Sequence, residues 1–326
     1  MSCPHGLACP TLNVHVVVNR RARRLSDASS PLLGALLDAA RAANAVVHET
    51  FEPGELASLA DHLLGARAVV LAGGDGAYTA GVTALVHAAE REKRELPPIA
   101  FAPGGTVSTT ARNWGLRGPL AKYATDLVAR VADGRANRDV RPSLRVTDDE
   151  GGDRVGFIWG AGLVARFFDA YYASPHSGYA GAARIVTRIF VGSPFGGVLA
   201  KRVLTPVPCE VWIDGDLQRA RGYSLMTSSV VKNLGLHMMV LYRAGEDPAR
   251  VHFVASPLGA PLLGPQMPLV LMGKRLRGRG HVDALAKEAR VRFAERDAYV
   301  LDGDVINARD VTVRAGPSLV LLSARD

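Results

Sequence analysis

The run Val69-Val70-Leu71-Ala72-Gly73-Gly74-Asp75-Gly76 is the most informative stretch of this chain: apolar residues lead into a glycine-rich turn with one carboxylate. The apolar spacing of residues 77–92 predicts an amphipathic helix directly after the turn. A strand that runs through glycines into a helix places unpaired backbone N–H groups and the positive helix end at one point. Such a point binds phosphate, and glycines let the backbone approach it closely. An ordinary strand-to-helix turn, with Asp75 near the helix start, is the plainer alternative.

The first 135 residues alternate predicted strands with predicted helices. Apolar runs predict strands over residues 12–19, 45–50, 68–72 and 99–102. Helices are predicted over residues 31–44, 54–64, 77–92 and 120–132, and Ser30 and Pro31 form a start signal for the first. This alternation indicates a parallel sheet with helices on both faces. Ligands of such sheets bind at the carboxyl ends of the strands, where the glycine loops at 73–76 and 103–106 lie.

The pattern changes after Asp133-Gly134 to short strands and polar turns. Two hairpins are predicted, one over residues 143–159 around a glycine turn and one over residues 209–227 around Asp214-Gly215. Further short strands are predicted over residues 251–255, 289–293, 298–301 and 311–313, and helices near residues 163–173 and 182–191. We therefore expect an α/β domain over residues 11–140 and a β-rich domain over residues 141–326. The last strands of the second domain are expected to be able to pack back on the first.

The composition describes a soluble globular chain. Its 326 residues are 48% hydrophobic and 21% charged, and no apolar run reaches the roughly 18 residues of a membrane span. Residues 1–10 lack the basic flank and apolar stretch of a signal peptide, which favours a cytoplasmic location. Cys3, Cys9 and Cys209 are an odd set, which argues against a disulfide framework. Cys3, His5 and Cys9 on a short tail would make a poor metal site, so we expect no metal ligands.

The formal net charge is +8, and basic residues gather in two clusters. They consist of Arg20, Arg21, Arg23 and Arg24, and of Lys274, Arg275, Arg277 and Arg279. Such clusters attract nucleotide phosphates, a phospholipid surface or nucleic acid, although solvated loops remain an alternative for the second cluster. Aromatic residues make up only 6% of the chain and do not interleave with the basic residues. This disfavours a nucleic-acid partner.

An ordered set of motifs resembles the catalytic domain of the diacylglycerol kinase family, which covers bacterial lipid kinases and the sphingosine and ceramide kinases. The matching segments are Asn19 with the basic residues after it, Gly73-Gly74-Asp75-Gly76, Pro103-Gly104-Gly105-Thr106-Val107-Ser108 with residues 111–116, Phe157 to Ala170, and Asp302-Gly303-Asp304. The likeness spans about Asn13 to Leu322. One match would be weak, but the order of the whole set is specific for the fold.

The resemblance implies an N-terminal α/β domain with a parallel doubly wound sheet, of the NAD kinase and diacylglycerol kinase type, and a C-terminal, mostly antiparallel β-sandwich. ATP and Mg²⁺ would bind in the cleft between them. The implied nucleotide-binding residues are Asn19, Arg20, Gly73, Gly74, Asp75, Gly76, Gly104, Gly105, Thr106 and Ser108. Asp75 would order magnesium-bound water, and Asp304 would accept the proton of a lipid hydroxyl. A plain hairpin turn stays open for Asp304, because Asp214-Gly215-Asp216 repeats the tripeptide.

The chain departs from the family pattern at several positions on the expected nucleotide side. Ala77 replaces a threonine, Thr79 and Ser108 stand where asparagine is usual, Arg20 replaces a proline, and Trp159 replaces an asparagine. Losing one charge-assisted contact costs about 1.5 to 3 kcal/mol, so several losses together could abolish turnover. Arginines 20, 21 and 23 could compensate by holding phosphate directly.

We therefore expect an ATP-dependent lipid kinase of phospholipid metabolism, acting on a hydroxyl of diacylglycerol or a sphingoid-type lipid at an anionic membrane surface. The basic loop from Lys274 to Arg279 and the apolar stretch from Leu258 to Leu271 would approach the bilayer. The prolines of that stretch predict a loop or edge segment and not a helix. A catalytically impaired relative that binds nucleotide or lipid is the main alternative, and a kinase for a soluble dinucleotide is another. Whether the chain forms a homodimer stays open.

Overall fold

The N-terminal half is built on a parallel-rich sheet, sheet A, in a computed structural model that describes residues 13–174 and 178–325. Its strand order is β2-β1-β3-β4-β17-β5. The strands are β1 (Val14–Asn19), β2 (Val46–Thr50), β3 (Ala68–Gly73), β4 (Ile99–Pro103), β5 (Asn137–Arg141) and β17 (Leu319–Ser323). All neighbours pair in parallel except β5, which runs antiparallel to β17. Cys3, His5 and Cys9 lie outside the described residues.

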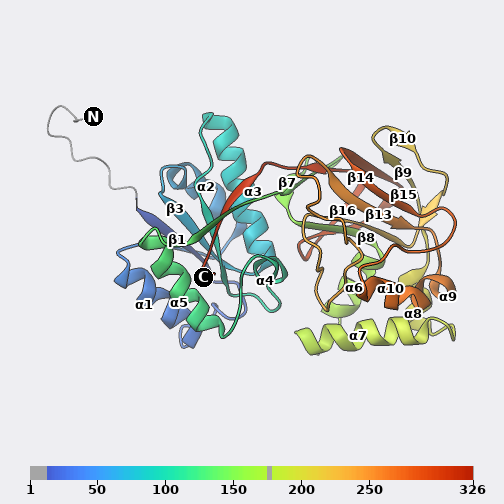
Figure 1. Cartoon of the computed structure of the whole chain (residues 1–326), viewed down its shortest axis with the longest axis horizontal. Coiled ribbons are helices and arrows are strands. Elements are labelled where there is room, and N and C mark those ends of the chain that lie inside the picture. The colour runs from blue at the N-terminus through green and yellow to red at the C-terminus, as the bar shows by residue number, and fades with distance from the viewer. Residues whose placement is uncertain (1–12, 175–177, 326) are drawn as a thin grey trace.

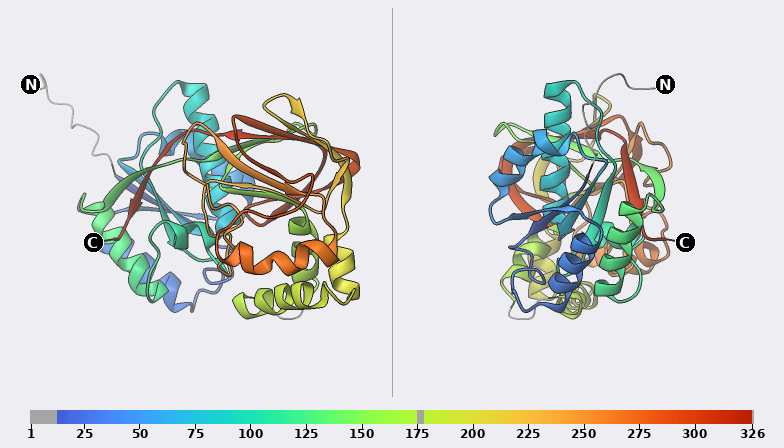
Figure 2. Two further views of the ribbon diagram at one scale, coloured as in Figure 1. Left: turned by 45° about the vertical axis from the view of Figure 1, so that its right-hand side comes forward. Right: turned by 90° about the vertical axis from the view of Figure 1, so that its left-hand side faces the viewer.

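Helices cover both faces of sheet A, as the alternating pattern predicted (Figures 1 and 2). They are α1 (Pro31–Ala42), α2 (Pro53–Leu63), α3 (Asp75–Glu92), α4 (Thr109–Asn113) and α5 (Leu120–Ala132). Helix α1 packs beside α5, and α2 beside α3. The side chain of Ser30 accepts the backbone N–H of Leu33, so the predicted start signal of α1 is confirmed. Every residue of β3 is buried, and its carboxyl end feeds directly into the first glycine loop.

The second half is built on a mostly antiparallel sheet, sheet B. Its main path has the order β14-β13-β12-β8-β15-β16-β6-β7, and β9 attaches to β15, with β10 and β11 beside it. The strands are β6 (Leu144–Asp148), β7 (Asp153–Gly156), β8 (Ile158–Gly162), β9 (Val207–Ile213), β10 (Asp216–Leu217), β11 (Gly222–Tyr223), β12 (Leu225–Ser229), β13 (Val251–Ser256), β14 (Val282–Ala286), β15 (Glu288–Leu301) and β16 (Asp304–Ala315). Together, sheets A and B confirm the predicted fold class.

Two strand predictions change in detail. The strands expected over residues 289–293 and 298–301 are parts of β15, whose pairing with β16 shifts between Arg292 and Asp297. The second hairpin is shorter than predicted, because residues 225–229 leave β9 and pair instead with β8 and β13. This change places β12 in the middle of sheet B, beside the strand that carries the Phe157 to Ala170 motif.

Short helices lie on one side of sheet B (Figures 1 and 2). They are α6 (Leu163–Tyr172), α7 (Tyr179–Gly192), α8 (Val198–Leu204), α9 (Ala260–Leu263), the 3₁₀ turn η1 (Gly264–Gln266) and α10 (Met267–Leu271). The prediction that Leu258 to Leu271 is not helical was therefore wrong. Pro261, Pro265 and Pro268 each stand in the first turn of a short helical segment. At that place a proline removes no helical hydrogen bond, so it starts a helix instead of breaking one.

The end of the chain returns to the first sheet. After β16, strand β17 inserts between β4 and β5 of sheet A, where Figure 2 shows it in red beside the N-terminal elements. The chain therefore passes between the two sheets twice, first from β5 to β6 and again from β16 to β17. Among the described residues, no helix combines the length and the apolar character needed to cross a bilayer.

Candidate active site

The two glycine loops contact each other backbone to backbone. The N–H groups of Gly104 and Gly105 both donate to the carbonyl oxygen of Gly73, at 2.7 and 2.9 Å. A Cβ added to Gly105 would lie 2.5 Å from the Cα of Gly74, so the contact requires glycine. These two amides hold the first loop in place. Any nucleotide contact that Gly104 and Gly105 make would therefore use other atoms than these N–H groups.

The first loop forms the N-terminus of α3, an 18-residue helix. Gly74 is its N-cap residue, and no side chain caps the first amides. The N–H groups of Asp75, Gly76 and Ala77 therefore remain without a helical partner at the positive end of the helix. This is the arrangement that the sequence predicted for phosphate binding.

Asp75 links the two loops. Its carboxylate accepts the backbone N–H groups of Thr109 at 2.8 Å and Thr110 at 2.9 Å, so it caps the start of α4. Burial raises the pKa of Asp75, although these two hydrogen bonds act in the opposite direction. Ser108, the residue before α4, has a φ of 53° and makes no capping bond itself. The predicted role of Asp75 with magnesium-bound water stays a prediction, and the bonds seen here fix the second loop to the first.

The loop after β1 lies beside the first glycine loop. Asn19 accepts the N–H of Arg21 at 2.9 Å, and a Cβ on Gly73 would lie 3.5 Å from the Cβ of Asn19. The guanidinium of Arg20 pairs with Glu49 at 3.3 Å, and that of Arg21 pairs with Glu52 at 3.1 Å. Phosphate binding by either arginine would have to compete with a carboxylate that already holds it.

A cleft of about 750 Å³ opens beside the second glycine loop. Its basic residues are Arg23, Arg24 and Arg112, and we call it the basic cleft. Its polar lining includes Thr106, Thr109, Asn113 and Asn233. The side chain of Arg112 also donates to the carbonyl of Val107 at 2.9 Å, which orients it along the loop. Arg112 belongs to the motif at residues 111–116 and was not predicted as a site residue.

A second, largely apolar cavity of about 350 Å³ lies between sheet B and helices α6 and α7. We call it the apolar cavity. Its apolar and aromatic lining is Ile158, Leu163, Val164, Phe167, Phe168, Tyr171, Tyr172, Tyr179, Ala182, Val186, Ile189, Phe190, Leu234, Leu236, Met238 and Val300. Gly74–Gly76 and Asp302–Asp304 also line it. It shares Thr106, Val107 and Thr109 with the basic cleft, so the two spaces adjoin along the second glycine loop.

Asp302 and Asp304 occupy different environments within one turn between β15 and β16. Asp302 is buried and accepts the backbone N–H groups of Phe157 at 2.9 Å and Ile158 at 2.8 Å, and also the hydroxyl of Thr79. Asp304 is exposed, and its carboxylate lies over the first glycine loop. A Cβ on Gly76 would lie only 2.9 Å from its Oδ1 atom. Partial desolvation raises the pKa of Asp304, against an opposing effect of Arg154.

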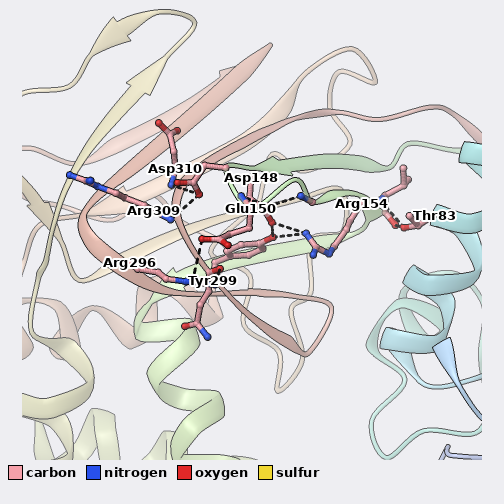
Figure 3. Close-up of polar contacts among 12 residues, drawn as sticks. Thr83, Asp148, Glu150, Arg154, Arg296, Tyr299, Arg309 and Asp310 are labelled. Atoms are coloured by element: carbon pink, nitrogen blue, oxygen red, sulfur yellow. Dashed lines mark hydrogen bonds and ion pairs between the residues drawn. The ribbon is translucent and has the colours of Figure 1, made fainter. Parts of the chain in front are cut away.

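A row of polar side chains on α3 joins the first loop to sheet B. Thr83 accepts the N–H of Val155 at 2.9 Å and donates to its carbonyl at 3.1 Å, a contact visible at the right of Figure 3. Glu90 pairs with Arg145 at 2.6 Å, and His87 lies 3.5 Å from Asp153. With Thr79, these residues follow the helical spacing of one face. The helix that presents the glycine loop is therefore held to the sheet that presents Asp304.

The turn between β6 and β7 is fixed by its own carboxylates (Figure 3). Asp148 accepts the hydroxyl of Tyr299 at 2.6 Å and pairs with Arg154 at 2.7 Å. These partners lower the pKa of Asp148 although burial alone would raise it. Asp149 accepts the backbone N–H groups of Arg309 and Asp310. The predicted polar turn thus anchors the hairpin on β15 and β16, the strands that bracket Asp302 and Asp304.

The comparisons with known proteins agree with this geometry. Residues 13–137 match the family model of the diacylglycerol kinase catalytic domain. The predicted resemblance to this family of kinases is confirmed. A comparison with curated proteins gives no match.

Solved structures extend the likeness in fold to the rest of the chain. A diacylglycerol kinase from Bacillus anthracis has a TM-score of 0.60 at 14% identity, with 96% of this chain and 97% of that chain covered. Another structure from the same organism, described as a candidate diacylglycerol kinase, has a TM-score of 0.66 at 15% identity, with 95% and 97% covered. At these identities the likeness establishes the fold of both domains but not the substrate.

Replacing Asp302 by asparagine should change how stability depends on pH. Burial, with a smaller effect of the nearby Asp75, raises the pKa of Asp302 to about 8. In the unfolded chain an aspartate has a pKa of about 3.9. At a pH between these two pKa values, the unfolded chain has lost a proton that the folded chain keeps. The wild-type protein therefore loses stability as the pH rises through this range. The asparagine side chain cannot titrate, and this component disappears in Asp302→Asn.

Urea unfolding of both proteins at about pH 5 and about pH 8 measures the effect. The variant is less stable throughout, because an amide presents one oxygen where the aspartate side chain accepts two backbone N–H groups with two. The free-energy difference between wild type and variant should shrink by at least about 1 kcal/mol from the lower to the higher pH. Two parallel pH profiles would contradict the assignment of a raised pKa to Asp302.

Proposed function

We propose that this chain is an ATP-dependent lipid kinase that phosphorylates a hydroxyl group of diacylglycerol or of a sphingoid-type lipid. The observation that supports this most strongly is the apolar cavity, whose lining includes Asp304 and the first glycine loop. Ligand sites are mostly apolar with a few placed polar groups, and this cavity combines apolar walls with the carboxylates of Asp75, Asp302 and Asp304. The hydrocarbon chain of a lipid would pack against the apolar walls, and the hydroxyl group of that lipid would reach the carboxylates of the cavity.

The nucleotide would lie on the other side of the second glycine loop. Arg23, Arg24 and Arg112 give the basic cleft the charge that a triphosphate requires, and the free amides of α3 are suited to the terminal phosphate. Because the two spaces share Thr106, Val107 and Thr109, a phosphate in one can meet a hydroxyl in the other. This supports direct transfer from ATP to the lipid.

The carboxylate of Asp75 suits Mg²⁺, which prefers hard oxygen ligands and keeps several water molecules. Each oxygen of Asp75 accepts one backbone N–H, which leaves lone pairs for metal-bound water. When bound, Mg²⁺ would neutralise charge on the phosphates. Asp75 is the residue that would hold it, through its water molecules.

Asp304 is the proposed proton acceptor. The lipid hydroxyl would give its proton to the Asp304 carboxylate as its oxygen bonds to the terminal phosphorus, and ADP would leave with the electrons of the broken bond. The raised pKa of Asp304 makes it a stronger base than an ordinary carboxylate. Asp302 does not suit this role, because both of its oxygens accept backbone N–H groups in the interior.

We further propose that the helical layer α7–α10 contacts an anionic membrane surface, as a peripheral protein would. Large apolar side chains are exposed on it, among them Phe195 at 87%, Val198 at 86% and Leu262 at 62%. Exposed basic residues accompany them on the same helices and the loop that follows, namely Arg188, Lys201, Arg202, Lys274, Arg277 and Arg279. Apolar insertion combined with positive charge is the pattern of interfacial binding. Helix α7 also lines the apolar cavity, which gives a lipid a short path from the bilayer.

A catalytically impaired relative remains the second candidate. Ala77 offers no hydroxyl at the start of α3, and Arg20 and Arg21 are paired with glutamates. These observations leave fewer groups for phosphate and magnesium water than the family pattern provides. Turnover with lipid separates this candidate from an active kinase.

Asp304→Asn should reduce lipid phosphorylation by about 10²–10⁴-fold while ATP still binds, because asparagine cannot accept the proton. The assay follows transfer of labelled phosphate from ATP–Mg²⁺ to diacylglycerol or sphingoid lipid in mixed vesicles. Asp216→Asn is the matched control, since Asp216 ends the other Asp-Gly-Asp tripeptide on the exposed β10 strand. Wild-type protein that labels no lipid would favour the impaired relative, and equal activity of both variants would remove Asp304 from the mechanism.

Ala182→Phe should block the apolar cavity from α7. Ala182 is buried in the cavity wall, so a phenyl ring there occupies the space proposed for the lipid chain. We expect lipid phosphorylation to fall at least about tenfold, with ATP binding by thermal shift unchanged. Ala180→Phe, on the exposed side of the same helix, is the control and should keep full activity. Equal loss in both variants would indicate damage to α7 and not a blocked lipid site.

Phe195→Ser should weaken binding to vesicles that contain anionic lipid, because a ring of this size contributes about 1.5 to 3 kcal/mol when it leaves water. Vesicle co-sedimentation measures the bound fraction with and without added salt. Val140→Ser is the control, since Val140 is 69% exposed on β5, far from α7–α10. Binding that is the same for the wild type and both variants would exclude this helical layer as the membrane surface.

A further inference from the structure

Three histidines from separate elements meet at one edge of sheet A. His15 lies on β1, His48 on the edge strand β2, and His62 on α2. The register pairs His48 with Val17, two residues after His15, so both rings lie on the same face of the sheet. His62 closes the group from the last turn of α2. His15 stands four residues before Asn19, roughly 13 Å along the strand, so the cluster is separate from the candidate active site.

The ring nitrogens are close enough to share one ion. One nitrogen from each histidine lies within 4.8 Å of the other two, and Nδ1 of His15 is 2.9 Å from Nε2 of His48. The rings of His15 and His48 are stacked, while that of His62 stands edge-on to both, at centroid distances of 5.1 and 6.0 Å. A tetrahedral zinc ion separates its nitrogen ligands by roughly 3.4 Å, so small side-chain rotations would complete the site.

The protonation state also suits a metal. A contact of 2.9 Å between two ring nitrogens requires at least one bare nitrogen, which is the form that binds metal ions. His15 is only 6% exposed within a strand that is otherwise mostly valine. A polar ring at such a place is costly unless it has a strong partner.

We propose that His15, His48 and His62 bind a divalent transition-metal ion, with zinc as the preferred metal. Three imidazoles suit zinc and its neighbours in the first transition series, and the absence of a carboxylate from this cluster of described residues disfavours magnesium and calcium. His62 is exposed, which leaves the fourth position open to water. The ion would join the edge strand β2 to β1 and α2, so it would stabilise the N-terminal domain. This proposal is independent of the proposed kinase activity.

Zinc binding to the full chain, first cleared of metal with a chelator, tests the proposal. Isothermal titration and metal analysis after dialysis should give one zinc per chain, and zinc should raise the thermal unfolding midpoint. Cobalt in place of zinc should give the visible absorption of a tetrahedral nitrogen site. His62→Asn is the main variant, because its exposed position on α2 carries little risk to the fold, and it should lower zinc affinity at least about 10-fold. His87→Asn, on α3 and outside the cluster, should bind as the wild type does.

A further variant separates this site from the N-terminal tail. Replacing Cys3, His5 and Cys9 together by serine, asparagine and serine removes the tail's potential ligands from the full chain. Retained binding in this variant, together with loss in His62→Asn, supports the proposal. No zinc binding by the wild type, or equal binding by wild type and His62→Asn, would overturn it.

Discussion

The arrangement of the candidate site depends on how α3 is held against sheet B. The helix presents the first glycine loop at its N-terminus, while sheet B presents Asp304 from the turn between β15 and β16. Thr79 bonds to the buried Asp302, and Thr83 bonds twice to Val155. An internal hydrogen bond contributes about 0.5 to 1.5 kcal/mol, and a buried group left without its partner costs about 1 to 3 kcal/mol. These bonds are therefore expected to hold the first glycine loop and the carboxylate of Asp304 at a fixed distance from each other. A phosphoryl transfer requires this, because it depends mainly on positioning.

The glycine loops add a second constraint on the same point. Gly73 accepts the N–H groups of Gly104 and Gly105, and Asp75 accepts those of Thr109 and Thr110. The second loop therefore cannot move without breaking bonds to the first. The two cavities are tied to this contact in part, because they share Thr106, Val107 and Thr109. They also share Tyr179 of α7 and the Gly235-Leu236 segment. Movement of α3 would alter both cavities together.

Local patterns predicted most of the fold, and long-range contacts account for what they missed. Apolar runs, the Ser30 cap and the glycine turns are local, and they located strands β1 to β4 and the main helices of sheet A. Strands β5 and β17 were not predicted, because their place in sheet A depends on a pairing between distant parts of the chain. The apolar cavity was not predicted, because its walls come from α6, α7 and strands distant in sequence. The only local signal was the aromatic run Phe167-Phe168 and Tyr171-Tyr172. The three histidines were also missed, because the intervals between them resemble no known ligand motif and their proximity arises from strand register.

The departures from the family motifs acquire a different meaning in three dimensions. From the sequence, Thr79 and Trp159 looked like lost nucleotide contacts. Thr79 instead bonds to Asp302, and Trp159 is fully buried, with its ring against Phe253 and Tyr299. Thr79 therefore acts in the contact between the domains, and Trp159 acts in the core of sheet B. At both places neighbouring residues can compensate for a change of side chain. Ala77 differs, because it stands among the free amides of α3, where a hydroxyl has no substitute. Of the departures from the family pattern, Ala77 in the first glycine loop and the paired Arg20 beside it therefore bear most directly on whether the chain can catalyse phosphoryl transfer.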